Sequence, residues 1–157
     1  MSFPKIGNMA PAFSLLDQDG NKVSLKDFKG EKNVILYFYP KAMTPGCTTQ
    51  ACGLRDSKRK LSAAKTVALG ISPDPVARLK KFEQRDDLNF TLLSDEDTKV
   101  TEKYGCWGLK KFMGKEYMGV LRTTFIIGKD GKLKHIMDKV KTKTHHDDAL
   151  TWIKENL

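Results

Sequence analysis

The stretch NVILYFY at residues 33–39 constrains the fold of this chain more than any other feature. A strand with one face in solvent alternates polar and apolar side chains, but here six apolar or aromatic residues follow one another, as in a strand buried on both faces. VALGI at residues 67–71 has the same character. Two such strands predict a sheet covered by helices, and Pro40, which has no N–H to donate to a strand ladder, ends the first of them.

Helix, strand and turn patterns alternate along the rest of the chain. Turn signals at Asp19-Gly20 and Asp130-Gly131 predict two hairpins, with strands at 13–16 and 23–25 and at 122–127 and 133–137, and a further strand is predicted at 90–93. The first predicted helical segments are a short turn capped by Ser24 and Asp27, and a helix over residues 48–64. A third helix has Asp74 as its N-cap and Pro75 as its first residue, and runs to residue 85. A fourth runs from the Ser94 and Asp97 capping box to about Gly105, and the last is capped by Thr144 with Asp147 three residues on.

This order of elements predicts an α/β fold of the thioredoxin-like type, with a mixed central sheet flanked by helices and an N-terminal hairpin. A chain of 157 residues is long enough for a sufficient core, and no repeat, low-complexity tract or linker divides it. Residues 1–157 are therefore expected to form a single domain. Chemistry in such sheets lies where a central strand ends and a helix begins, which here means residues 40–48.

Composition argues against several classes of function. The longest apolar run is far shorter than the roughly 20 residues of a membrane span, and the first residues lack a signal-peptide pattern. Three cysteines make a poor disulfide scaffold, so a cytoplasmic protein with reactive rather than structural cysteines is expected. The formal net charge is +9, but basic residues are scattered and only Lys58, Arg59 and Lys60 form a run, so neither nucleic acid nor a membrane is an expected partner.

Two of the three cysteines stand five positions apart in PKAMTPGCTTQAC, residues 40–52. Cys47 immediately precedes the predicted helix, where unpaired N–H groups and the helix dipole stabilise an anion, so a nucleophilic thiolate is expected there. Pro40 stiffens the loop, Gly46 allows a substrate to approach the backbone, and Thr44 supplies a hydroxyl group. Together these residues predict a small preorganised pocket.

Cys52 is too distant on an intact helix to bond with Cys47. Five residues of ideal helix separate two Cα atoms by about 8.6 Å, whereas a disulfide needs less than roughly 7 Å. Thr48 and Thr49 are weak helix formers, and Gly53 costs about 1 kcal/mol relative to alanine. The segment is therefore predicted to be a two-state element whose first turn opens before the two sulfur atoms meet.

Other uses of the cysteines remain open at this level. A free cysteine often serves as a small buried apolar residue. Zinc would need more ligands, yet His145 and His146 are about a hundred residues away, and the acidic Asp147 and Asp148 beside them suit the first turn of any helix. The Cys-x-x-Cys motif of thioredoxin-type reductases is absent.

The segment YFYPKAMTPGCTTQACGLRD, residues 37–56, resembles the active site of peroxiredoxins of the bacterioferritin comigratory protein branch, also called peroxiredoxin Q. The resemblance extends over nearly the whole chain, through APAFSLLDQDG, NFTLLSDED, GCWGLKKFMGKEYMG and RTTFIIGKDGK. Its most specific part is the Pro-x-x-x-Thr-x-x-Cys signature formed by Pro40, Thr44 and Cys47. The family implies a thioredoxin fold and reduction of hydrogen peroxide and organic hydroperoxides by thiol chemistry, without metal, haem or flavin.

By this resemblance, Cys47 is the peroxidatic cysteine, which attacks the peroxide and becomes a sulfenic acid. Thr44 orients the peroxide, and Pro40 shields the thiolate and the sulfenic acid from water. Arg122 matches the context of the arginine that stabilises the thiolate and the charge moving between the peroxide oxygens. Gln50 stands where the family places a Glu or Gln that holds this arginine.

Cys52 matches the resolving cysteine of members whose two cysteines are five residues apart. It would attack the sulfenic acid to form an intramolecular disulfide, which thioredoxin, or in some members glutaredoxin, reduces. Members with the resolving cysteine on the next helix differ, because this chain has Glu83 near that position. An intramolecular disulfide needs no second subunit, so a monomer is expected. Cys106 is expected to be a packed thiol, with an accessory resolving or oxidation-sensitive role as the alternative, and His135 is expected to be structural.

Two other functions remain open from the sequence. One is a disulfide reductase or isomerase on the same fold. The other is a redox-sensing or holdase-type binding protein, which uses the same disulfide as a switch to change its partners.

Overall fold

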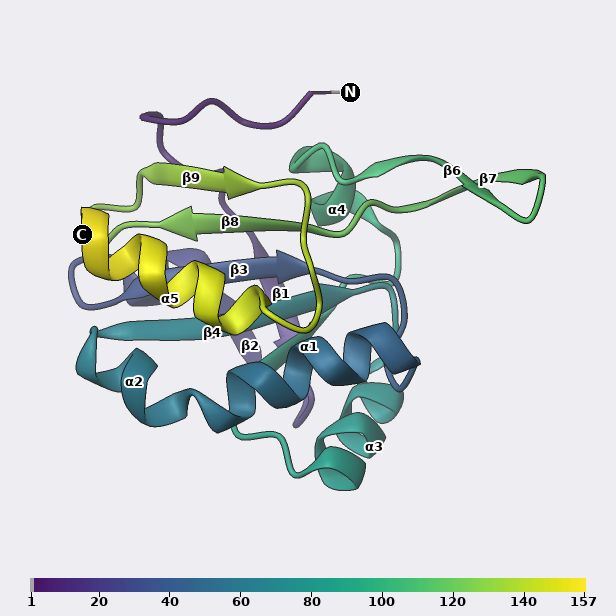
Figure 1. Ribbon diagram of the computed structural model, residues 1–157, viewed down its shortest axis with the longest axis horizontal. Helices are drawn as coiled ribbons and strands as arrows, with labels where there is room; N and C mark the ends of the chain where they lie inside the picture. The colour runs from purple at the N-terminus through teal and green to yellow at the C-terminus, as the bar shows by residue number, and fades with distance from the viewer. Residues whose placement is uncertain (1) are drawn as a thin grey trace.

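A computed structural model describes residues 2–157 and contains a seven-stranded sheet and a separate two-stranded hairpin (Figure 1). The strands are β1 (Ser14–Asp17), β2 (Lys22–Ser24), β3 (Asn33–Phe38), β4 (Thr66–Ser72), β5 (Thr91–Ser94), β6 (Trp107–Phe112), β7 (Lys115–Val120), β8 (Thr123–Ile127) and β9 (Leu133–Met137). The helices are the 3₁₀ turn η1 (Leu25–Phe28), α1 (Pro45–Asp56), α2 (Lys58–Ala63), α3 (Val76–Asp86), α4 (Lys99–Lys103) and α5 (His145–Asn156).

The large sheet is mixed, in the order β2-β1-β5-β4-β3-β8-β9. β3 pairs in parallel with β4, and β4 with β5, whereas β1 pairs antiparallel with β2 and β5, and β8 with β3 and β9. The predicted α/β class, mixed central sheet and N-terminal hairpin are confirmed. None of the described helices combines the length and the apolar character needed to cross a membrane.

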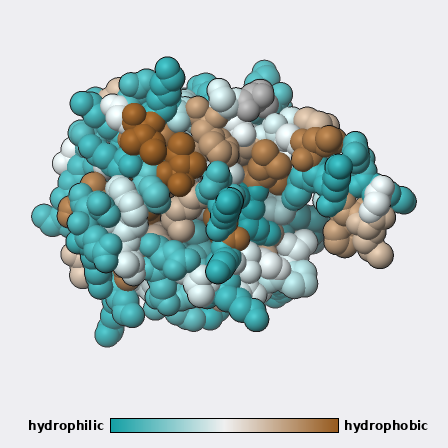
Figure 2. Space-filling model, turned by 45° about the horizontal axis from the view of Figure 1, so that its top comes forward, coloured by the Kyte–Doolittle hydropathy of each residue, from teal (hydrophilic) through white to brown (hydrophobic). Residues whose placement is uncertain are grey.

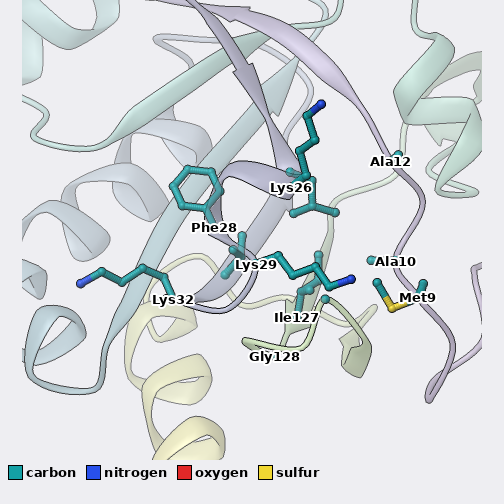
Figure 3. Close-up of a pocket in the computed structure, with 12 residues that line it drawn as sticks. Met9, Ala10, Ala12, Lys26, Phe28, Lys29, Lys32, Ile127 and Gly128 are labelled. Carbon is teal, nitrogen blue, oxygen red and sulfur yellow. The ribbon is translucent and has the colours of Figure 1, made fainter.

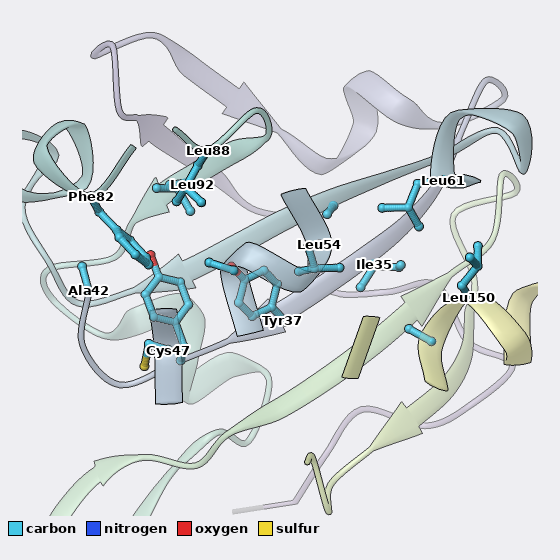
Figure 4. Close-up of a cluster of buried hydrophobic side chains, with 14 of the residues drawn as sticks. Ile35, Tyr37, Ala42, Cys47, Leu54, Leu61, Phe82, Leu88, Leu92 and Leu150 are labelled. Atoms are coloured by element: carbon cyan, nitrogen blue, oxygen red, sulfur yellow. The ribbon is translucent and has the colours of Figure 1, made fainter. Parts of the chain in front are cut away.

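β3 is buried along its whole length because its alternate side chains enter two different cores. Ile35 and Tyr37 belong to the core that α1, α3 and α5 cover, and Figure 4 shows this cluster with Cys47 among its side chains. Leu36 and Phe38 belong to the core on the opposite face, which includes Val100 of α4. The two-sided burial explains why the strand carries no polar alternation.

The hairpin β6–β7 was not predicted from the sequence. It projects from the body as an arm (Figures 1 and 2), and several of its apolar side chains are exposed, including Phe112 and Met113 at its tip. Met113 and Gly114 both have positive φ, as a type I′ hairpin turn requires. Because little of this arm contributes to a core, it lacks the buried periodicity from which the other strands were predicted.

Helix boundaries differ from the predictions around the first long helix. α1 begins at Pro45, not at Thr48, so Cys47 lies within the first turn and not before it. Proline suits this position because its missing N–H would have no partner in a first turn. The predicted helix over 48–64 is two helices, with Ser57 between them donating from its hydroxyl to the Gly53 carbonyl at 2.9 Å.

Two predicted N-caps are also wrong. Pro75, not Asp74, caps α3, because the Asp74 carboxylate is used by other groups described below. Ser94 belongs to β5, and α4 starts only after Thr98. Its first N–H groups are served by Asp95, whose carboxylate accepts from the Thr101 N–H at 2.8 Å.

Two other predicted N-caps, Ser24 and Thr144, are confirmed. The Ser24 N–H donates to the Asp27 carboxylate at 2.9 Å, as the predicted capping box requires. Thr144 is the N-cap of α5, but its hydroxyl bonds Asp148 at 2.8 Å, not Asp147.

Candidate active site

Cys47 follows the loop that connects β3 to α1 and is the third residue of the helix. Thr44 is the N-cap, and its carbonyl accepts from the Thr48 N–H at 2.9 Å. The sulfur is therefore carried by the first turn of the helix, where backbone N–H groups have no partner within the helix. Only 1% of Cys47 is exposed, so this polar environment acts in a site that is largely closed to water.

Arg122 connects Cys47 to Gln50. It lies between β7 and β8, and its Nη2 donates to Cys47 Sγ at 3.3 Å while its Nη1 donates to Gln50 Oε1 at 2.6 Å. Gln50 is fully buried one turn along α1 from Cys47, so the guanidinium is held in a fixed position. A cation and a helix N-terminus on the same sulfur both stabilise its anionic form.

The remaining loop residues of the predicted site surround Cys47 at the same end of the sheet. The Thr44 hydroxyl donates to the Lys41 carbonyl at 2.9 Å, which leaves its oxygen free to accept a further hydrogen bond. Pro40 is half-buried. A Cβ on Gly46 would lie 3.5 Å from Arg122 Nη2, so the space beside this glycine is shared with the arginine.

A buried carboxylate next to α3 fixes the loop that carries Cys47. Asp74 Oδ2 accepts from the Ala42 N–H and from the Ser72 hydroxyl, both at 2.7 Å. Its Oδ1 pairs with Arg78 Nε at 3.1 Å, and Arg78 Nη2 donates to the Ala42 carbonyl at 2.9 Å. No local pattern in the sequence predicts this clamp, because Ala42 lies more than 30 positions from both Asp74 and Arg78.

Two arginines connect the outer side of α1 to α3. Arg85 Nη2 donates to Thr48 Oγ1 at 2.7 Å, in the turn that contains Cys47. Arg55 Nη1 donates to the Asp86 carbonyl at 2.6 Å, two turns further along. An opening of the first turn alone would therefore break the first contact and leave the second in place.

Cys52 lies on the same unbroken helix as Cys47, and both thiols are free. With about 8.6 Å between Cα atoms on an ideal helix, they are too far apart for a disulfide in this conformation. Cys52 is half-buried, and desolvation raises the pKa of its thiol, an effect that the nearby Arg55 opposes. Cys52 is accordingly more accessible than Cys47, and less disposed to ionise than an ordinary thiol in water.

Gly53 has a packing role in addition to its low helix propensity. A Cβ at this position would lie 2.2 Å from Nδ1 of His146, which is far inside contact distance. The glycine therefore lets the start of α5 approach α1 closely. Of the features predicted to weaken this helix, Thr48 and Thr49 remain, whereas Gly53 is explained by the contact.

The third cysteine and two of the histidines considered in the sequence analysis pack against other side chains and lie outside the Cys47 site. Cys106 is fully buried in the second core, and burial raises the pKa of its thiol to about 12, which supports the packed interpretation. His145 is also buried, with Nε2 2.8 Å from Thr124 Oγ1, and burial lowers its pKa to about 4. His135 stacks on Trp152 at 4.6 Å between ring centroids.

Glu83 accepts hydrogen bonds from Gln18 at 2.6 Å and from Lys80 at 2.8 Å. Within residues 2–157, no three His, Cys, Asp or Glu side chains come together as a metal site would require.

Comparison with known proteins agrees with this geometry. The AhpC/TSA family model matches residues 6–136. The chain is 55% identical over 152 residues to peroxiredoxin Bcp of Escherichia coli (strain K12), with 97% of each chain covered, and 46% identical over 151 residues to peroxiredoxin Bcp of Bacillus subtilis (strain 168), with 96% of each covered. Among solved structures, peroxidoxin BcpB of Mycobacterium tuberculosis superimposes with a TM-score of 0.86 at 34% identity over 98% of both chains.

A peroxiredoxin Q structure from Xanthomonas campestris gives a TM-score of 0.86 at 29% identity, covering 92% of this chain and 90% of that one. The fold is therefore the thioredoxin fold of the peroxiredoxins, and the site is a cysteine at the start of a helix held by an arginine. The chain belongs to the AhpC/TSA family, as a peroxiredoxin of the Bcp or peroxiredoxin Q branch, and is a thiol peroxidase.

Proposed function

We propose that the chain reduces hydrogen peroxide and organic hydroperoxides with Cys47 as the peroxidatic cysteine. The observation that carries this proposal is the double hydrogen bond of Arg122 to Cys47 Sγ and to Gln50, at the N-terminus of a helix. A neighbouring solved structure, that of the Xanthomonas campestris bacterioferritin comigratory protein, is described by its alkyl peroxide reduction activity and a trapped intermediate or ligand complex. That description supports organic hydroperoxides as substrates here.

In the first step the Cys47 thiolate attacks the terminal peroxide oxygen. The S–O bond forms as the O–O bond breaks, so sulfur is oxidised to the sulfenic acid and the leaving alkoxide or hydroxide takes a proton to become an alcohol or water. Arg122 stabilises the negative charge as it passes from sulfur to the leaving oxygen. Thr44 orients the peroxide through its hydroxyl, Pro40 limits the access of water to the sulfur, and Gln50 and Gly46 support the position of the arginine.

In the second step Cys52 is the resolving cysteine. Its sulfur attacks the sulfenic sulfur, a disulfide forms, and the sulfenic oxygen leaves as water with the proton of the second thiol. This step requires the first turn of α1 to open, because the intact helix holds the two cysteines apart. Arg85, which bonds Thr48 in that turn, has to release it.

A dithiol reductant then returns the enzyme to its starting state, and we infer that thioredoxin supplies the two electrons, with glutaredoxin as the other reductant to be tried. We further propose that residues 1–157 act as one domain, as a monomer in the cytoplasm. An intramolecular disulfide supports the monomer, since no second subunit has to contribute a cysteine.

A thioredoxin-coupled peroxide assay tests the proposal. Wild type should consume hydrogen peroxide and an alkyl hydroperoxide with matching oxidation of NADPH, and Cys47→Ser should consume neither. Cys52→Ser should complete one turnover and then stop cycling with thioredoxin. Full cycling by Cys52→Ser would remove it as the resolving cysteine, and peroxide consumption by Cys47→Ser would remove the mechanism. Cys106→Ser is the matched control and should behave as wild type.

A further inference from the structure

An apolar hollow lies at the opposite end of β3 from Cys47 (Figure 3). Its volume is about 160 Å³, and its wall is largely apolar, formed by Met9, Ala10, Leu25, Phe28, Val34 and Ile127. Val34 is near the start of β3, whereas the Cys47 loop follows its end, and a six-residue strand is about 20 Å long. The hollow is therefore separate from the peroxide site.

The size of the hollow limits what it accommodates. An engineered apolar cavity of about 150 Å³ in another protein binds benzene, so a space of this volume takes a group of about six carbon atoms. Whole ligands of ordinary size occupy roughly 300–1,000 Å³. A ligand here would bury one short apolar end and leave the rest of the molecule at the opening.

The turn opposite Lys29 is shaped to leave this opening free. Gly131 has a φ of +82°, and a Cβ at this position would lie 2.7 Å from the Met9 terminal methyl and 3.6 Å from Lys29 Cδ. The absence of a side chain therefore makes room for both the Met9 wall and the lysine stem. Half of Met9 is exposed at the rim, which is unusual for a residue that packs only within a core.

Three lysines line the opening without a carboxylate partner. Lys26 lies within η1, Lys29 is the extended residue that ends it, and Lys32 follows in the next loop, and all three line the hollow. Figure 3 shows the Lys29 side chain extending toward Met9, whereas Lys26 extends in another direction and Lys32 extends away from Met9. Over the described part of the chain, none of the three forms an ion pair.

The described carboxylates of the surrounding elements form no ion pair with these three lysines. Asp27 accepts from the Ser24 N–H at 2.9 Å, and Asp130 pairs with Lys134 at 2.9 Å. Glu31 is exposed and does not line the hollow. An apolar chamber whose opening carries lysines outside any ion pair is complementary to a molecule with a short apolar end and a negative head.

We propose that this hollow binds a small amphipathic carboxylate, a free organic acid with a tail of about six carbons. The tail enters the chamber between Phe28 and Met9, and the carboxylate meets Lys29, with Lys26 and Lys32 adding to the positive potential. Lysine stems also cover apolar surface without binding anything. That alternative predicts no preference for the charge of an added ligand, and the two are therefore distinguishable.

Titration calorimetry with hexanoate, and NMR of the Met9 methyl group, test the proposal on the whole chain. Hexanoate should bind at least tenfold more tightly than acetate, hexanol or hexylammonium, and should shift the Met9 signal. The variant Lys26→Gln/Lys29→Gln/Lys32→Gln should weaken hexanoate binding about tenfold or more. The matched control, Lys58→Gln/Lys60→Gln/Lys154→Gln, removes the same charge elsewhere and should bind as wild type.

A second variant fills the chamber in place of changing its charge. Ala10→Leu should abolish hexanoate binding, and if it fails to fold, the lysine variants alone decide the question. Equal binding of hexanol and hexanoate, or equal loss in both triple variants, would overturn the proposal. So would binding only to anionic lipid vesicles, which would mean a surface attraction without a chamber. Peroxide reduction by the first triple variant should stay within twofold of wild type, so this test is independent of the proposed peroxidase mechanism.

Discussion

Replacing Gln50 tests whether Arg122 has to be held in place for peroxide reduction. Gln50→Leu preserves the size and burial of the side chain but removes Oε1, which accepts from Arg122 Nη1 at 2.6 Å. A hydrogen bond to a charged group contributes about 1.5–3 kcal/mol. Because about 1.4 kcal/mol corresponds to a factor of ten, kcat/KM should fall roughly tenfold to a hundredfold.

The assay is initial peroxide consumption at limiting peroxide, with thermal unfolding as a check that the variant is folded. Gln50→Glu retains an acceptor in the same place and should keep kcat/KM within about fivefold of wild type, since an ionised acceptor bonds a guanidinium at least as well. A folded Gln50→Leu variant with kcat/KM within twofold of wild type would refute the reasoning. It would mean that Arg122 reaches Cys47 without its anchor.

Three further predictions concern packing and protonation. Gly53→Ala gains about 1 kcal/mol of helix propensity, but its Cβ would meet His146 at 2.2 Å, so urea unfolding should show a net loss of about 1–3 kcal/mol that His146→Ala reverses; an unchanged midpoint would contradict this. His145 has a pKa lowered to about 4, so the unfolded chain binds its proton more tightly, and stability should decline from about pH 6.5 to pH 4 by about 3 kcal/mol. Urea midpoints measured against pH should lose part of that slope in His145→Gln, and an identical slope would contradict the assignment. In native protein at pH 8, iodoacetamide should label the half-buried Cys52 before Cys106, which is fully buried and whose pKa is raised to about 12; mass spectrometry showing Cys106 labelled first would contradict its burial.

Elements buried on both faces were predicted well from the sequence, because burial leaves a direct pattern. The runs at 33–39 and 67–71 became β3 and β4 nearly as predicted. The projecting hairpin β6–β7 was missed, because its exposed apolar side chains follow no core-facing period. The start of α3 was wrong by one residue because the carboxylate predicted to cap it, that of Asp74, is engaged by Ala42 and Arg78.

Site residues close to Cys47 in the chain could be predicted from the sequence, whereas those far from it in the chain could not be predicted from local patterns. Residues near Cys47 in the chain were suggested by loop chemistry alone, through the prolines, Thr44 and the helix start. Arg122 and Gln50 were suggested only by the resemblance to a family, because no physical pattern joins positions 72 residues apart. Two further features depend on packing between distant segments and had no signal in the sequence. They are the hydrogen bonds of Asp74 and Arg78 to the Ala42 backbone, and the close approach of His146 to Gly53.

The central claim is that the turn holding Cys47 opens so that Cys52 resolves its sulfenic acid. Peptide mass mapping of reduced protein after one equivalent of hydrogen peroxide tests this most directly. A single intramolecular disulfide between Cys47 and Cys52 is the predicted product, formed at the same yield when the protein is diluted tenfold. A link from Cys47 to Cys106, a disulfide between two chains, or a sulfenic acid that persists beside a free Cys52 would contradict the account.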